Sequence, residues 1–247
     1  MARFRPRRLG VWLIAGLAAL AALVLGGTWI YIHAIEGPAP APLSLKSSPS
    51  SSVGPTLAGP SSSASASAGT AATTGIAGTW RVAAGSIVGY RVKEVLAGQN
   101  NVAVGRTGSI SGDMTISGTT VTTASFTVQM ATIHSDQSTR DAQFNGRIMD
   151  TAAYPTGTLT LTSPIAIGAR PANGVIKTYD ATGNLTLHGH TRSVTFTLQA
   201  ERTAAGINVS GSIPVLFANW SIANPSFGSF VTTQDHGQLE FLVKFAR

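Results

Sequence analysis

The sequence contains no cysteine and few charged side chains, and both shortages narrow what the protein can be. Without thiols it has neither disulfide bonds nor thiolate metal sites, which is compatible with an export compartment but does not demonstrate one. Only 11% of the residues are charged, and the formal net charge is +7. Arg3, Arg5, Arg7 and Arg8 supply four of these charges, so the rest of the chain is only mildly basic. Because no groove of basic residues interleaved with aromatics is visible, we expect no nucleic-acid partner.

The N-terminal region has the pattern of a membrane anchor. Residues 1–8 form a basic arm, and residues 9–35 contain no charged side chain. As a helix, this run would span roughly 40 Å at about 1.5 Å per residue, compared with about 30 Å for the hydrocarbon core of a bilayer. The upstream arginines predict a cytoplasmic N-terminus, with everything after the run on the other side of the cell membrane. We therefore predict a single-pass signal anchor with an extracytoplasmic domain. The alternative is a cleaved signal peptide, although Ala39-Pro40-Ala41 is a poor cleavage site because of its proline.

Residues 36–77 are rich in Pro, Ser, Ala and Thr and contain almost no large apolar side chains. Such a segment cannot bury enough apolar surface to offset the entropy lost on ordering, so we predict a disordered linker. A flexible chain of this length has a root-mean-square reach on the order of 35 Å. The linker would then act as a tether that holds the remaining domain, residues 78–247, away from the membrane.

From Thr79 onward, apolar and polar residues alternate in short runs separated by glycine-containing turns. The last run is representative, since Leu239, Phe241, Val243 and Phe245 alternate with mostly polar residues. Alternation with a period of two indicates strands that have one buried and one solvated face. About eight antiparallel strands of this kind stack as a sandwich or close as a barrel, and we predict an all-β, eight-stranded antiparallel, lipocalin-like barrel.

Residues 138–155 interrupt the strand pattern. Phe144 and Ile148 recur at helical spacing, and Tyr154-Pro155 requires an extended or turn conformation before the next strand. We predict a short helical crossover that separates two groups of strands and covers one end of the β-structure. Arg140 and Asp141 are interpreted as a structural pair that fixes this crossover.

The alternation also predicts which side chains point into the barrel. An inner wall of aliphatic and aromatic residues would either form a filled core or line a channel for a long apolar ligand, to which each buried CH₂ contributes about 0.8 kcal/mol. The residues themselves leave both possibilities open. The candidates for the lining are Val88, Tyr90, Val92, Ile110, Met114, Phe126, Val128, Phe196, Leu198, Phe241 and Val243.

Polar groups for a ligand head group are scarce. Arg91, Lys93 and Arg140 are possible head-group contacts because Arg in particular suits phosphate. However, Arg91 and Lys93 fall on the predicted outer face of their strand, where a solvated role is favoured.

Signals for metal binding or catalysis are weak. His188 and His190 lie two positions apart and point the same way on a strand, but no third ligand is near in sequence, so we predict no metal site and no cofactor. The segment from His134 to Ser138 contains the residue types of a hydrolytic triad, yet residues so close on one strand end cannot face one another as a triad does. No Gly-x-Ser-x-Gly motif is present, and we predict a protein that is not an enzyme.

Four stretches taken together resemble the YceI-like family of lipid-binding barrels. Residues 86–92 resemble its first long strand, and residues 138–144, continuing to Tyr154-Pro155, resemble its Arg-Asp crossover. Residues 183–192 resemble its Gly-x-Leu-Thr-x-x-Gly-x-Thr-Lys hairpin, with Arg192 in the Lys position. Residues 217–228 and 237–244 resemble its C-terminal strands, although residues 218–221 depart from the charged element of many members.

This resemblance implies an extended eight-stranded barrel with a helical crossover, whose interior binds a polyisoprenoid or similar long apolar lipid without catalysis. Combined with the N-terminal pattern, it predicts a membrane-anchored, extracytoplasmic binding protein for lipid storage, transfer or sequestration. The alternative is a solid β-barrel on a membrane stalk that serves as a protein-interaction module.

Overall fold

The computed structural model describes residues 39–45, 75–96, 98–228 and 231–247. The predicted basic arm, the apolar run 9–35 and most of the predicted linker lie outside these residues. Within the described ranges, no helix has the length and apolar character needed to cross a membrane.

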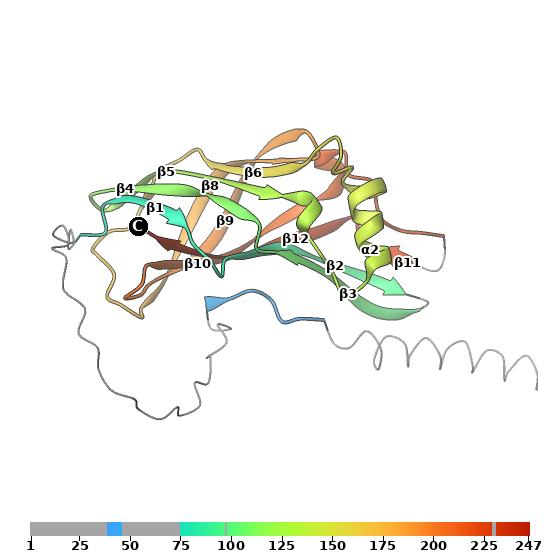
Figure 1. Ribbon diagram of the computed structural model, residues 1–247, viewed down its shortest axis with the longest axis horizontal. Helices are drawn as coiled ribbons and strands as arrows, with labels where there is room; N and C mark the ends of the chain where they lie inside the picture. The colour runs from blue at the N-terminus through green and yellow to red at the C-terminus, as the bar shows by residue number, and fades with distance from the viewer. Residues whose placement is uncertain (1–38, 46–74, 97, 229–230) are drawn as a thin grey trace, which may run out of the picture.

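The described chain is almost entirely β-structure, with one short helix (Figure 1). The strands are β1 (Gly78–Val82), β2 (Ile87–Leu96), β3 (Gln99–Thr107), β4 (Ile110–Ser117), β5 (Thr120–Gln129), β6 (Thr156–Leu161), β7 (Ile165–Ala166), β8 (Ile176–Leu187), β9 (His190–Arg202), β10 (Ile207–Leu216), β11 (Val231–Thr233) and β12 (His236–Ala246). The helical elements are η3 (Met130–Thr132), α2 (Ser138–Gln143), η4 (Phe144–Ile148) and η5 (Phe217–Trp220).

The strands close into an antiparallel barrel, as the alternation predicts. Neighbours follow the order β1-β4-β5-β6-β8-β9-β10-β12, and pairing of β1 with β12 closes this ring of eight. The strand β2 continues along β12 beyond β1, and β3 pairs with β2. At the closure, the Trp80 indole donates to the carbonyl of Ile76 at 2.8 Å, and the Arg247 guanidinium lies over the Trp80 ring.

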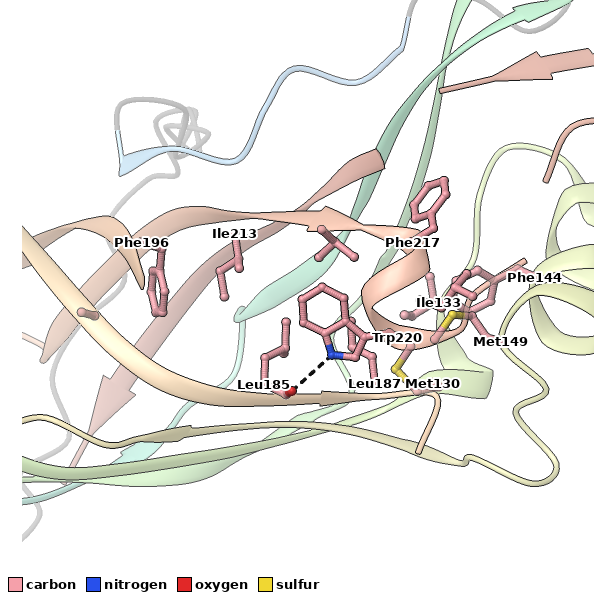
Figure 2. Close-up of a cluster of buried hydrophobic side chains, with 13 residues drawn as sticks. Met130, Ile133, Phe144, Met149, Leu185, Leu187, Phe196, Ile213, Phe217 and Trp220 are labelled. Atoms are coloured by element: carbon pink, nitrogen blue, oxygen red, sulfur yellow. Dashed lines mark hydrogen bonds between the residues drawn. The ribbon is translucent and has the colours of Figure 1, made fainter. Parts of the chain in front are cut away.

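The interior holds two clusters of buried apolar side chains, one toward each end of the barrel. Figure 2 shows the larger cluster, in which Trp220 of η5 and Phe144 of η4 pack near the inner residues of β8, β9 and β10. Trp220 is 2% exposed, and its indole Nε1 donates to the carbonyl of Leu185 at 3.3 Å. We call the end that carries α2, η4 and η5 the helical end, and the other the open-turn end.

The predicted crossover is present. The helix α2 and the π-helical turn η4 follow one another, and Tyr154-Pro155 leads directly into β6. Phe144 and Met149, which face the barrel, are buried at 8% and 5% exposure.

Three features differ from the sequence-based expectations. The strand β3 was missed, because its start is polar and its inner positions are small, so it lacks an alternating run of large apolar residues. The alternation predicts two separate strands around Lys177 and Leu185, but the structure has one continuous strand, β8, over both. Disorder was predicted throughout residues 36–77, but residues 39–45 lie against the barrel, with Leu45 only 7% exposed, because they find polar partners on its outer face.

Candidate functional site

The barrel encloses an elongated apolar cavity of about 340 Å³. It runs between the two core clusters, and its wall is made by the inward residues of the barrel strands together with η4 and η5. A volume in this range is typical of pockets that bind small molecules. The cavity does not fit the alternative of a solid barrel.

All eleven residues that the alternation predicted as inner wall line this cavity. They come from β2, β4, β5, β9 and β12, which surround it on several sides. The residues are Val88, Tyr90, Val92, Ile110, Met114, Phe126, Val128, Phe196, Leu198, Phe241 and Val243. Their role in binding a ligand stays a prediction.

At the helical end, an aromatic pair bounds the cavity. The rings of Tyr90 and Phe144 stack with centroids 5.1 Å apart. The Tyr90 ring lies over Gly105, its partner across the β2–β3 pair, and a Cβ at Gly105 would be 2.4 Å from the ring. Burial raises the pKa of the Tyr90 hydroxyl, so it stays protonated at neutral pH.

One ion pair borders the cavity beside these rings. The guanidinium of Arg140 on α2 lies 3.4 Å from the carboxylate of Glu94 on β2, and both residues line the cavity. Their side chains are 17% and 11% exposed, and Arg140 also pairs with Asp136. The structure therefore brings one of the three proposed head-group contacts to the cavity. Arg91 and Lys93 lie on the outer face, where Lys93 is exposed.

Asp141 fixes the start of the crossover by a different set of contacts. Its carboxylate accepts hydrogen bonds from the Ser135 hydroxyl at 2.7 Å and the Ser135 backbone N–H at 2.8 Å, and His134 Nδ1 lies 3.2 Å away. Desolvation acts to raise the pKa of Asp141, but these hydrogen bonds outweigh it and lower the pKa below its ordinary value. Arg140 and Asp141 thus fix the crossover through separate partners. The Ser135 hydroxyl donates to a carboxylate and not to a histidine, so this cluster lacks the nucleophile–base pair of a hydrolase.

At the open-turn end, the cavity wall includes Tyr179, Glu201 and Arg202. The Tyr179 hydroxyl is buried and has no hydrogen-bond partner among the described residues. Desolvation raises the pKa of Tyr179, which keeps this hydroxyl a hydrogen-bond donor. The sequence placed Tyr179 on a strand but not in a site. Tyr179 and Ala181 lie two positions apart on β8 and both point inward, so the period-two alternation could have placed Tyr179 on the inner wall.

Of the two histidines, His188 serves the architecture. His188 sits in the β8–β9 turn with φ 47°, its Nδ1 lies 3.3 Å from the carbonyl oxygen of Trp220, and its ring packs edge-on against Tyr154. Arg192 donates to the carbonyl of Asn219 at 2.9 Å. The Leu-Thr hairpin motif thus fastens β8 and β9 to η5. No group of three or more potential metal ligands occurs in the part of the chain that the structure describes.

Comparison with known proteins agrees with this architecture. A family model described as YceI-like domain matches residues 80–245. A polyisoprenoid binding domain from Saccharophagus degradans has a similar structure, with a TM-score of 0.56 and 16% identity over 69% of this chain and 98% of that chain. BcnA of Burkholderia cenocepacia gives a TM-score of 0.49 and 22% identity, over 64% of this chain and 96% of that chain. A search of curated proteins found no match.

Proposed function

Because the chain belongs to the YceI-like domain family, we propose that its barrel binds a polyisoprenoid or a similar long-chain apolar lipid without catalysis. The observation that carries this proposal is the apolar cavity of about 340 Å³ running along the barrel. A hydrocarbon tail needs a dry, apolar wall, and each buried CH₂ contributes about 0.8 kcal/mol, so a long tail binds without many polar contacts. The similar domain from Saccharophagus degradans is described as polyisoprenoid binding, which supports the same ligand class.

The polar groups at the cavity ends suggest how a head group is held. Arg140 is the one proposed head-group contact that lines the cavity, and its forked guanidinium suits phosphate or another anionic group. Glu94 beside it reduces the local positive charge, so the pair fits a head group that exchanges readily. Such a site supports our proposal of binding for storage, transfer or sequestration, whereas catalysis would need a nucleophile and a base, which these contacts do not provide.

Native mass spectrometry of the full chain tests lipid binding. We expect co-purifying or added polyisoprenoid to appear as a mass adduct on the wild-type chain. Ala181 is 3% exposed and lines the cavity, so Ala181→Phe should occupy part of the cavity and reduce the adduct of a long-chain polyisoprenoid at least tenfold. Asn184→Phe on the exposed face of the same strand is the matched control and should bind as the wild type does. The absence of any adduct on the wild-type chain, or equal adducts on all three, contradicts the proposal.

We also propose that residues 9–35 anchor the chain in the cell membrane and that the barrel lies outside the cytoplasm. The uncharged run and the arginines before it support this arrangement. Because the chain has no cysteine, a single Ala204→Cys in the β9–β10 turn reports its side of the membrane. An impermeant maleimide should label this residue on intact cells. Labelling only after lysis contradicts the proposed topology.

A further inference from the structure

The outer face of the barrel carries a docking site for the chain's own residues 39–45, which we call the clasp. Arg91 of β2 donates to the carbonyl of Pro40 at 2.6 Å, and Arg106 of β3 donates to the carbonyl of Ala41. The backbone N–H of Leu43 lies 3.4 Å from the Glu240 carboxylate of β12. Three neighbouring strands therefore each supply one charged side chain to the clasp.

These charged groups are held in place by one another. Glu240 is 4% exposed and accepts from Arg91 and, at 3.3 Å, from Arg106. Gly89 lies between Arg106 and Glu240 in the strand register, and a Cβ there would be 3.0 Å from the Arg106 side chain. The absence of a side chain at Gly89 lets Arg106 cross the strand to reach Glu240. Two guanidinium groups share one carboxylate, so their remaining donors are available to backbone carbonyls.

The sequence of the clasp suits these donors. Pro40 and Pro42 hold the backbone extended, and an extended proline-containing segment forms no internal hydrogen bonds, so its carbonyls are free to accept. The prolines also restrict the segment before it docks, which lowers the entropy lost on docking. Leu45 ends the clasp and is 7% exposed.

The direction of the clasp relates it to one end of the barrel. Leu43 contacts Glu240, which lies opposite Gly89 on β2. Pro40 contacts Arg91, two residues further along β2 toward Leu96, where the strand ends beside the helical end. The Ala39 end therefore points toward the helical end, and Figure 1 shows the clasp as the blue segment outside the barrel. Only residues 36–38 separate Ala39 from the apolar run 9–35. The distance from Ile35 to Ala39 is therefore at most roughly 14 Å, even with the chain fully extended.

The helical end also exposes apolar side chains. Phe227 lies just before β11, forms a backbone bridge with Val231 at the start of that strand, and is 73% exposed. Val95 on β2, the strand that pairs with β11, is 37% exposed. Ile222 and Pro225, from the same connection between η5 and β11, line the cavity. Exposed aromatic and aliphatic side chains clustered at one end of a molecule suit contact with a lipid surface.

We propose that the clasp holds the barrel close to the membrane, with its helical end facing the lipid surface and Phe227 in contact with it. This inference rests on the proposed membrane anchoring. The long tether expected from the composition of residues 36–77 is thereby replaced by a short connection at Ala39. The cavity then receives its lipid from the end that faces the bilayer.

Spin-label distances test the clasp itself on the full chain. With Ala39→Cys and Asn100→Cys labelled, the clasped protein gives one narrow distance distribution. Two variants should broaden this distance distribution at least twofold. One replaces Arg91 and Arg106 together by Ala, and the other replaces residues 40–45 by a Gly-Ser sequence of equal length. Lys93→Ala, an exposed position on the same strand as Arg91, is the matched control and should leave it unchanged. A broad distribution in the wild type, or no response to either variant, overturns the clasp.

Energy transfer from the barrel to a lipid-headgroup dye tests the orientation in vesicles. A fluorophore at Asn100→Cys, on the β2–β3 hairpin at the helical end, should transfer at least twofold more efficiently than one at Ala204→Cys, at the open-turn end. The Gly-Ser variant should remove this difference, while its lipid adduct in native mass spectrometry stays at the wild-type level. Equal transfer from both positions in the wild type overturns the orientation. If the wild-type chain showed no lipid adduct but kept the difference in energy transfer between positions 100 and 204, the proposed lipid binding would be contradicted and the clasp would stand.

Discussion

The two faces of β2 and β12 carry different chemistry on alternate residues of the same strands. The inner face of β2 presents Val88, Tyr90 and Val92 to the cavity, whereas its outer face presents Arg91 to the clasp. On β12, Phe241 lines the cavity, and its neighbour Glu240 anchors the clasp. One alternating pattern therefore encodes two different surfaces, an apolar cavity wall on one face and a docking face for a segment of the same chain on the other.

The largest effect should come from placing a charge on the inner face. Leu185 on β8 is 4% exposed, so Leu185→Asp would bury a carboxylate without a partner and cost at least about 4 kcal/mol of the free energy of unfolding. Urea unfolding followed by circular dichroism measures this loss. The neighbouring Asn184→Asp, on the exposed face, should change the free energy by no more than about 0.5 kcal/mol. Similar losses for the two variants would show that the faces are not distinguished.

A smaller effect should follow from disrupting the outer face. Glu240→Ala leaves the half-buried guanidinium groups of Arg91 and Arg106 without their carboxylate and should cost about 2 kcal/mol. Glu240→Gln retains a hydrogen-bond acceptor and should cost about half as much. Denaturant titration measures both variants. Lipid binding should change far less than in Ala181→Phe, because the Glu240 carboxylate pairs with Arg91 and Arg106 on the outer face, although the residue also borders the cavity. A loss of lipid binding in either variant would contradict the separation of the two surfaces.

The smallest effect concerns the crossover that closes the helical end. The folded-state pKa of Asp141 is lowered, so its stabilisation is fully present above the ordinary value of 3.8 and is lost as the pH falls through the lower folded-state value. Asp141→Asn should cost about 1 kcal/mol at pH 6, and this difference from the wild type should shrink below pH 3.8. Unfolding free energies across that range measure it. The exposed Asp113→Asn is the control, and a pH-independent difference for Asp141→Asn would contradict the assignment.

The sequence predicts the inner face far better than the outer face. Large apolar residues alternating with polar ones reveal the wall at Phe126, Val128 and Phe241, because burial imposes a regular period on each strand. The strand β3 escaped this signal, since Ala103 and Gly105 occupy inner positions where large side chains would be expected. Family resemblance, and not periodicity, supplied the expectation of a cavity.

The clasp escaped prediction for a different physical reason. Its proline- and alanine-rich composition is typical of a disordered linker, and no local feature of the sequence shows that it docks on the barrel. Its order depends on Arg91, Arg106 and Glu240, which lie on three strands distant in sequence and meet only in the closed barrel. Tyr179 was overlooked similarly, because an unpartnered hydroxyl is recognised only once the surrounding wall is known.

A chain-length series of polyisoprenoid alcohols tests the central claim of an apolar binding cavity most directly. If the cavity holds the tail, binding to the full chain should saturate at one ligand per chain, and affinity should rise with each added isoprene unit until the cavity is filled, because each buried CH₂ contributes about 0.8 kcal/mol. Ala181→Phe should move the plateau to shorter chains. Affinity that does not depend on chain length, or binding that never saturates, would contradict a lipid-binding interior.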